Sequence, residues 1–222
     1  MNLPIFILTI KVAMVATAIN LPVALAISWL VTRKQIKGKL VLDVLVSLPL
    51  VIPPVAIGYF LLLLLGRNGP LGTVLHNVAG IDLVFTWIAA AIASSIVSFP
   101  LIARTIMVAI ANVDRRLEMS ARSLGAGPWR VFITITLPLA YRGILAGILL
   151  GFVRAMSEFG ATVVVAGNIK DKTQTIPIAL FTNVQIGNDQ AALQLVGASI
   201  FLAVVTLVIH NWLLDKSRQK GF

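Results

Sequence analysis

The stretch ANVDRRLEMSARSLGAGPWRVFITIT, residues 111–136, is a charged connector between two long apolar runs. Within it, Leu117, Ala121 and Leu124 recur at spacings of four and three, which places them on one face of a helix. Asp114 stands where a helix N-cap is expected, and Glu118 falls in the first turn, where a carboxylate complements the helix dipole. The connector is therefore predicted to contain a short amphipathic helix.

The runs on either side of the connector are long enough to cross a lipid bilayer, whose core of about 30 Å needs about 20 helical residues. The chain has 222 residues, of which 59% are hydrophobic and 12% charged, with a mean hydropathy of +0.98. Soluble domains carry roughly 25% charged residues, and disordered chains are poor in apolar ones. We therefore predict an all-α integral membrane protein with about five transmembrane helices, at 5–31, 43–65, 84–110, 137–156 and 192–214.

Residues 157–191 are a mixed segment that follows the fourth predicted span. Part of it, IPIALFTNVQIG at 176–187, is apolar but too short to cross a bilayer. We interpret it as an interfacial or re-entrant piece.

The basic residues predict how the chain is oriented. Twelve of the 18 Lys and Arg residues lie in the connector 32–42, in or just beyond the connector 111–136, and after residue 214. The connectors on the opposite side hold only Arg67, Lys170 and Lys172. Because Lys and Arg concentrate in cytoplasmic loops, we expect the N-terminus outside and the C-terminus inside. The net charge of +10 is then a consequence of topology and does not indicate nucleic-acid binding.

Glycine and proline mark the end of the predicted amphipathic helix on the cytoplasmic side. Gly125 and Gly127 terminate it, and Pro128 blocks its continuation. Two interpretations are open at this point: a helix that lies on the membrane surface, and a helix that docks a cytoplasmic partner.

The sequence patterns of common enzyme classes are absent. Gly38-Lys39 is followed by Leu40 and lacks the preceding glycine of the phosphate-binding pattern GxxxxGK[ST], so this chain is not expected to carry a phosphate-binding loop. The patterns HExxH and GxSxG are missing, and the two histidines, His76 and His210, are far apart in sequence. Cysteine is absent, which excludes disulfides and thiolate metal sites. We expect no catalytic residues, bound metal or bound cofactor in this chain, and a membrane-embedded enzyme and a secondary transporter stay open as alternatives at this point.

The connector resembles the EAA coupling motif of ABC importer permeases. That motif reads Glu-Ala-Ala, three residues, Gly, nine residues, then Ile-x-Leu-Pro. Here Ser120-Ala121, Gly125 and Ile135-Thr136-Leu137-Pro138 stand at the required spacings, while Met119 occupies the Glu position and Glu118 precedes it by one residue. The resemblance implies an ATPase-coupling segment made of Glu118, Met119, Ser120, Ala121, Arg122, Leu124, Gly125, Ala126 and Gly127.

Further stretches are similar to the molybdate/tungstate branch of these permeases. They are LPLVIPPVAIGYFLLLLLGRNGPLG (48–72), SFPLIARTI (98–106), SEFGATVVVAGN (157–168) and TQTIPIALF (173–181). The Ala161-Thr162 pair and the Gly-Arg-x-Gly element at 66–69 favour molybdate over the related sulfate and thiosulfate permeases, which stay the alternative.

The resemblance implies the type I ABC importer permease fold, with residues 1–222 as one transmembrane domain in the bacterial cytoplasmic membrane. It also implies a homodimer beneath which two copies of an ATPase bind ATP and Mg, and an external protein that delivers the oxyanion. In such an assembly, Arg122 and Arg130 are candidates to pair with acidic residues of the ATPase.

Charged and polar residues inside spans are candidates for the translocation path, because charges are costly in hydrocarbon. Arg154 and Glu158 are four residues apart and are expected to pair on one helical face. The path candidates are Arg104, Ser157, Glu158 and Thr162. Helix kinks are expected at Pro53, Pro54 and Pro100, either as packing features or as elements that shape the cavity.

Overall fold

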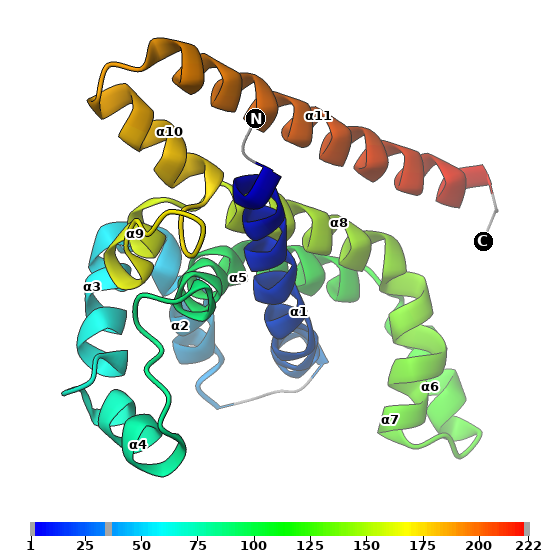
Figure 1. The fold of residues 1–222 in the computed structure, drawn as a ribbon. Helices are drawn as coiled ribbons and strands as arrows, with labels where there is room; N and C mark the ends of the chain where they lie inside the picture. The colour runs from blue at the N-terminus through cyan, green and yellow to red at the C-terminus, as the bar shows by residue number, and fades with distance from the viewer. Residues whose placement is uncertain (1–2, 34–36, 220–222) are drawn as a thin grey trace.

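The fold was analysed in a computed structural model, which describes residues 3–33 and 37–219. Throughout these residues every regular element is a helix (Figure 1). Two of the basic residues counted above, Lys34 and Lys220, lie outside the described residues, as do the side chains of Lys216 and Arg218. The elements are α1 (Leu3–Arg33), α2 (Lys39–Val51), α3 (Pro54–Leu65), α4 (Pro70–Ala79), α5 (Trp87–Ala111), α6 (Arg115–Ser123), α7 (Pro128–Val131), the π-helix η1 (Phe132–Thr136), α8 (Leu137–Met156), α9 (Gly160–Ala166), α10 (Ile176–Gln185) and α11 (Asp189–Gln219).

The long apolar helices confirm most of the predicted spans. Four segments are long and apolar enough to cross a membrane: Leu3–Arg33, Trp87–Ala111, Pro128–Met156 and Asp189–Ile209. The fourth predicted span begins too late, because the helical run of α7, η1 and α8 extends it back from residue 137 to Pro128. Pro128 therefore opens a new helix, where a proline at the first position loses no intrahelical hydrogen bond.

The predicted span 43–65 is not a continuous helix. It is divided into α2 and α3, whose axes differ by 106°, and only this broken pair raises the number of candidate spans to five. At the break, Ile52 and Pro53 have extended backbones, with ψ of 131° and 132°. A residue that precedes proline disfavours the helical region, so two successive prolines stop α2 completely. Pro100, by contrast, lies within the uninterrupted helix α5.

The core of the structure is α5, which is covered by α1 on one side and α8 on another (Figure 1). Three glycines of α8 face α5 at intervals of four residues: Gly143, Gly147 and Gly151. A Cβ atom on Gly143 would lie 2.3 Å from the Cβ of Ala109. Small residues at such intervals let helix backbones approach closely, which is how helices associate in lipid.

Polar side chains fix α1 against α5. The amide of Asn20 donates to the Ser95 carbonyl at 2.9 Å and contacts the Ser98 hydroxyl at 3.1 Å, and the Ser95 hydroxyl donates back to Asn20 Oδ1 at 2.6 Å. All three residues are buried. Hydrogen bonds between helices of this kind set the register of the two helices inside a bilayer.

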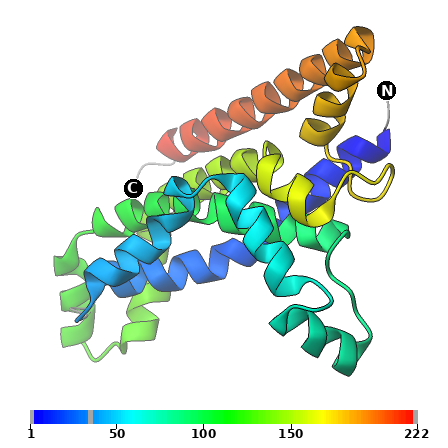
Figure 2. The ribbon, with the colours of Figure 1, turned by 90° about the vertical axis from the view of Figure 1, so that its left-hand side faces the viewer.

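The two ends of the helical bundle carry different elements (Figure 2). The first turns of α1, together with α4 and α10, lie at one end, while α6, α7 and the last turns of α11 lie at the other. Residues 176–187, which were expected to be an interfacial or re-entrant piece, form the short helix α10 at the first of these ends, and α9 precedes it in the mixed segment 157–191.

The glycine contact between α8 and α5 predicts the effect of Gly143→Ala. The added methyl group meets the Cβ of Ala109, which no rotamer change can move, so the two helices must separate. We expect a loss of about 1–3 kcal/mol in stability, seen as a lower Tm of the purified protein in detergent. The matched control is Gly197→Ala in α11, where a Cβ atom meets nothing within 4 Å and alanine improves helix propensity. An unchanged Tm for Gly143→Ala would contradict this account.

Candidate functional site

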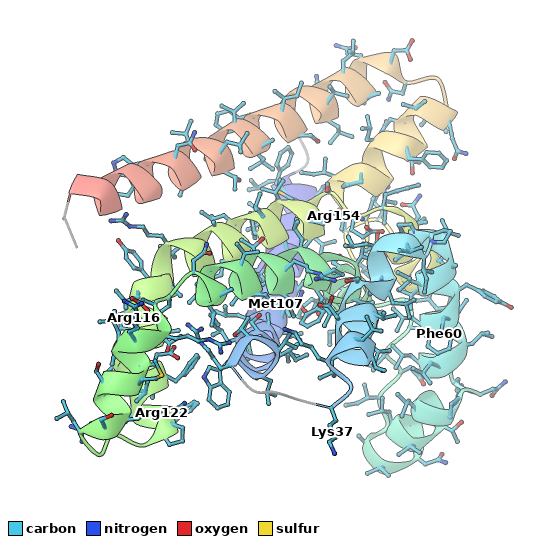
Figure 3. The ribbon with its side chains drawn as sticks, turned by 180° about the vertical axis from the view of Figure 1, so that it is seen from behind. Lys37, Phe60, Met107, Arg116, Arg122 and Arg154 are labelled. Carbon is cyan, nitrogen blue, oxygen red and sulfur yellow. The ribbon has the colours of Figure 1, made fainter. Side chains whose placement is uncertain are left out.

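The helices α6 and α7 form a projection beyond the bundle, and Figure 3 shows Arg116 nearer the bundle and Arg122 nearer the tip. As predicted, Asp114 caps α6: its Oδ1 accepts the backbone N–H of Arg116 at 2.9 Å. Helix α6 ends at Ser123, and Gly125 then adopts a φ of +86°, a conformation that favours glycine. Gly125 therefore allows the sharp turn that brings α7 back beside α6.

The tip of this projection exposes large apolar side chains. Leu124 is 89% exposed, Trp129 69% and Met119 58%, and Leu117 is also exposed. The four basic residues Arg115, Arg116, Arg122 and Arg130 are exposed in the same projection. We call this surface, made of Leu117, Met119, Leu124 and Trp129 with its surrounding arginines, the α6–α7 tip. Exposed apolar surface with a polar rim is typical of a protein-binding site.

Glu118 is the exception among the nine predicted coupling residues, because its side chain points into the protein. Its carboxylate lies 3.0 Å from Nε of Arg33, at the end of α1, and both side chains are buried. The other predicted coupling residues are exposed or half-buried. Sequence reasoning missed Arg33, which appeared only as one of the basic residues that follow the first span.

Arg104 in α5 is paired with α2. Its Nη1 lies 3.0 Å from Oδ1 of Asp43, its Nε donates to the Ser47 hydroxyl at 3.2 Å, and its Nη2 also bonds to that hydroxyl. The side chains of Arg104 and Asp43 are 43% and 35% exposed. The opposite charges of Arg104 and Asp43 balance each other, and both side chains are accessible from outside the bundle.

The predicted pair of Arg154 and Glu158 is confirmed, with Nη1 and Oε2 2.8 Å apart, but the expected shared helical face is wrong, because α8 ends at Met156 and Glu158 follows it. The other carboxylate oxygen of Glu158 accepts the backbone N–H of Ala161 at 2.9 Å, which satisfies a free donor at the start of α9. Glu158 and Thr162 are buried, and the Thr162 hydroxyl donates to the Phe159 carbonyl at 2.9 Å. Only Ser157 of this group is exposed.

These contacts indicate that Glu158 and Thr162 stabilise the fold. They join the end of α8 to α9, and α9 in turn packs closely on α3, where a Cβ atom on Gly58 would lie 2.6 Å from the Ala161 carbonyl oxygen. Of the four path candidates, Arg104 and Ser157 are thus the two with accessible polar groups. Among residues 3–33 and 37–219, no three His, Asp or Glu side chains gather so as to hold a metal ion.

Comparison with known families identifies the chain. The family described as binding-protein-dependent transport system inner membrane component matches residues 21–219. The chain belongs to this family. It is therefore a multi-pass inner-membrane transport subunit, and the α6–α7 tip is a surface of an ABC transporter permease.

Several curated relatives match this permease over nearly its whole length. The molybdenum transport system permease protein ModB of Escherichia coli is 44% identical over 96% of this chain and 94% of its own. ModB of Haemophilus influenzae is 42% identical over 96% of this chain and 93% of its own. The sulfate transport system permease protein CysW of Synechocystis is 35% identical, over 95% of this chain and 76% of its own.

Solved structures of the same fold belong to ABC importers. The inward-facing MetNI methionine transporter has a TM-score of 0.72 at 15% identity, over 96% of this permease and 92% of the matched chain. A transporter for the acidic polysaccharide alginate has a TM-score of 0.72 at 19% identity, over 100% of this permease and 82% of the matched chain. The same alginate system has also been solved with a pentasaccharide-bound periplasmic protein. At these identities the likeness shows the fold, which is that of ABC importer permeases.

Proposed function

We propose that this permease carries molybdate, or the similar anion tungstate, across the cytoplasmic membrane. The support is that the ModB proteins of Escherichia coli and Haemophilus influenzae are 44% and 42% identical to this chain over nearly full length, whereas CysW of Synechocystis is 35% identical. The single observation that carries the transport role is the α6–α7 tip, an exposed apolar surface on a member of an importer family. The alternative, sulfate or thiosulfate, rests on the CysW relatives.

We further propose a complete assembly of three components. Two copies of this permease form the path, a pair of ATPase subunits binds the α6–α7 tips with ATP and Mg, and an external protein delivers the anion. The family description names dependence on a binding protein. In the most apolar part of α11 only 11% of the residues are buried, against 61% in α5. Helix α11 therefore has a large apolar surface for lipid and for a second copy of the permease.

The binding of an ATPase to the α6–α7 tip also determines the proposed orientation. ATP is hydrolysed in the cytoplasm, so α6, α7 and the last turns of α11 lie inside. The first turns of α1 lie at the opposite end of the bundle, so the proposal has the N-terminus outside. The distribution of basic residues predicts the same orientation.

Leu124→Asp tests this docking surface. Leu124 is almost fully exposed and lies beyond the end of α6, so the change does not disturb the permease core. A buried carboxylate without a partner at the interface is expected to reduce copurification of the ATPase about tenfold or more, at unchanged permease abundance in the membrane. The control is Leu40→Asp, a leucine that is also largely exposed and lies in the first turn of α2, where an acidic residue suits the helix dipole. Full copurification with Leu124→Asp would refute the docking surface and the orientation derived from it.

For the path, we propose that the anion passes the half-exposed pair of Arg104 and Asp43. A lone guanidinium inside the membrane would attract a dianion and then retain it, because the attraction is strong where water is scarce. Asp43 cancels that charge, so the site orients the anion by weak hydrogen bonds and releases it. Ser157 offers a similar uncharged contact at the end of α8.

Asp43→Asn tests the balance of charge in the path. The variant leaves Arg104 without its counter-ion, and we expect the anion to be released about tenfold more slowly, seen as a lower maximal uptake rate in proteoliposomes. The double variant Asp43→Asn/Arg104→Gln is neutral again and is expected to recover most of that rate. Uptake by Asp43→Asn at the wild-type rate would remove this pair from the path.

Reconstitution tests the substrate. The permease, its ATPase and its binding protein are placed in proteoliposomes, and ATP hydrolysis and anion uptake are measured with molybdate, tungstate or sulfate as the only oxyanion. We expect molybdate and tungstate to stimulate both, and sulfate to stimulate neither at the same concentration. Equal stimulation by sulfate would favour the alternative substrate, and uptake without the ATPase would indicate a secondary transporter instead.

A further inference from the structure

The buried pair of Arg33 and Glu118 joins α1 to α6. Arg33 Nε and Glu118 Oε1 are 3.0 Å apart, and the two side chains are 4% and 9% exposed. Glu118 is the only buried residue of α6, whose other side chains lie at the surface or partly so. Glu118 is therefore the residue of α6 that reaches into the bundle.

The same two residues also engage α5 and η1. Arg33 Nη2 donates to the carbonyl oxygens of Ile110 and Val113, at 2.8 and 2.9 Å, around the carboxyl end of α5. The Thr136 hydroxyl, at the end of η1, donates to Glu118 Oε1 at 2.6 Å. We call Arg33, Glu118 and Thr136 the α1–α6 joint; it connects four elements through buried polar contacts.

Two further contacts surround the α1–α6 joint. Arg115 of α6 donates to the Thr32 carbonyl at the end of α1, at 2.6 Å. On the apolar side, Trp29 of α1 packs edge-on against Phe132 of η1, with ring centroids 5.9 Å apart. Helix α1 thus meets α6 and η1 through charge, hydrogen bonds and aromatic packing at once.

A buried ion pair is a poor way to gain stability, because its desolvation offsets most of the attraction. What such a pair supplies is a fixed geometry, since neither charge can leave its partner without a large cost. The joint lies where a fixed geometry matters: between a short exposed helix and the end of a 31-residue helix. The π-helical turn of η1 belongs to a class of irregularity that is frequent at functional sites.

We propose that Arg33 and Glu118 are positioning residues that transmit a displacement of α6 directly to α1. This role rests on the proposed function, in which the ATPase moves the α6–α7 tip. When α6 shifts, Glu118 carries Arg33 and the end of α1 with it, and the bonds from Arg33 to Ile110 and Val113 keep α5 in register. Without the joint, ATP hydrolysis continues at the docked ATPase, but less of the movement reaches the spans.

The first test is Glu118→Gln in the reconstituted transporter, with the anion taken up per ATP hydrolysed as the readout. Gln keeps the size of the side chain but loses the charge that holds Arg33, and we expect the ratio to fall about tenfold, the scale of an ordinary coupling free energy. Asp114→Asn is the matched control: it makes the same chemical change four residues earlier, at a cap position where Asn replaces Asp well. An unchanged ratio for Glu118→Gln would overturn the proposal.

The second test remains informative if Glu118→Gln fails to fold. The chain contains no cysteine, so the double variant Arg33→Cys/Glu118→Cys carries a unique pair of thiols. Removing both charges leaves no unpaired ion, and this variant is therefore better tolerated than either single change. We expect a low uptake per ATP before, and recovery after, the two thiols are bridged by a short thiol-reactive cross-linker. Cross-linked protein that stays uncoupled would overturn a mechanical role.

The two proposals fail in different ways. If the unaltered chain shows no ATP-driven uptake in the complete assembly, the proposed function is wrong. If the unaltered chain transports and Glu118→Gln keeps the same ratio of uptake to ATP hydrolysis, only the role of the α1–α6 joint is wrong.

Discussion

Close approach of helix backbones is the constraint on which the rest of this structure depends. In a bilayer, lipid tails are as apolar as leucine, so helices must associate through tight packing and hydrogen bonds. The glycines of α8, which face α5, supply the tight packing, and Asn20 with Ser95 and Ser98 supplies the hydrogen bonds. Because α5 contacts α1, α2, α8 and α9, its position determines how these four helices lie relative to one another.

The charged pairs described above follow a consistent division. Fully buried carboxylates, Glu118 and Glu158, each have an arginine partner and a hydrogen-bond donor, and both connect consecutive or neighbouring helices. The accessible pair of Arg104 and Asp43 joins helices as well but keeps its polar groups available. Burial thus separates charges that hold the fold from charges that can meet an anion, and sequence position alone does not make this separation.

Features encoded within one turn of helix could be predicted from the sequence. The Asp114 cap and the pair of Arg154 and Glu158 depend on spacings of two to four residues, and the structure has both. Sequence spacing could not predict that Arg33 pairs with Glu118 or Asp43 with Arg104, because these residues are far apart in the chain. The 106° break was expected only as a kink, because two prolines predict an interruption of the helix but not its angle.

Helix α1 extends from the α1–α6 joint to the opposite end of the bundle. At about 1.5 Å per residue its 31 residues span about 46 Å, enough to cross the bilayer core completely. At one end Arg33 contacts Glu118; at the other, the Thr9 hydroxyl accepts the backbone N–H of Ile176 at 2.9 Å, at the start of α10. Between them, Asn20 binds α5. A displacement that enters at α6 therefore has a continuous helical connection to the opposite face, and α1 carries it there without passing through the broken pair of α2 and α3.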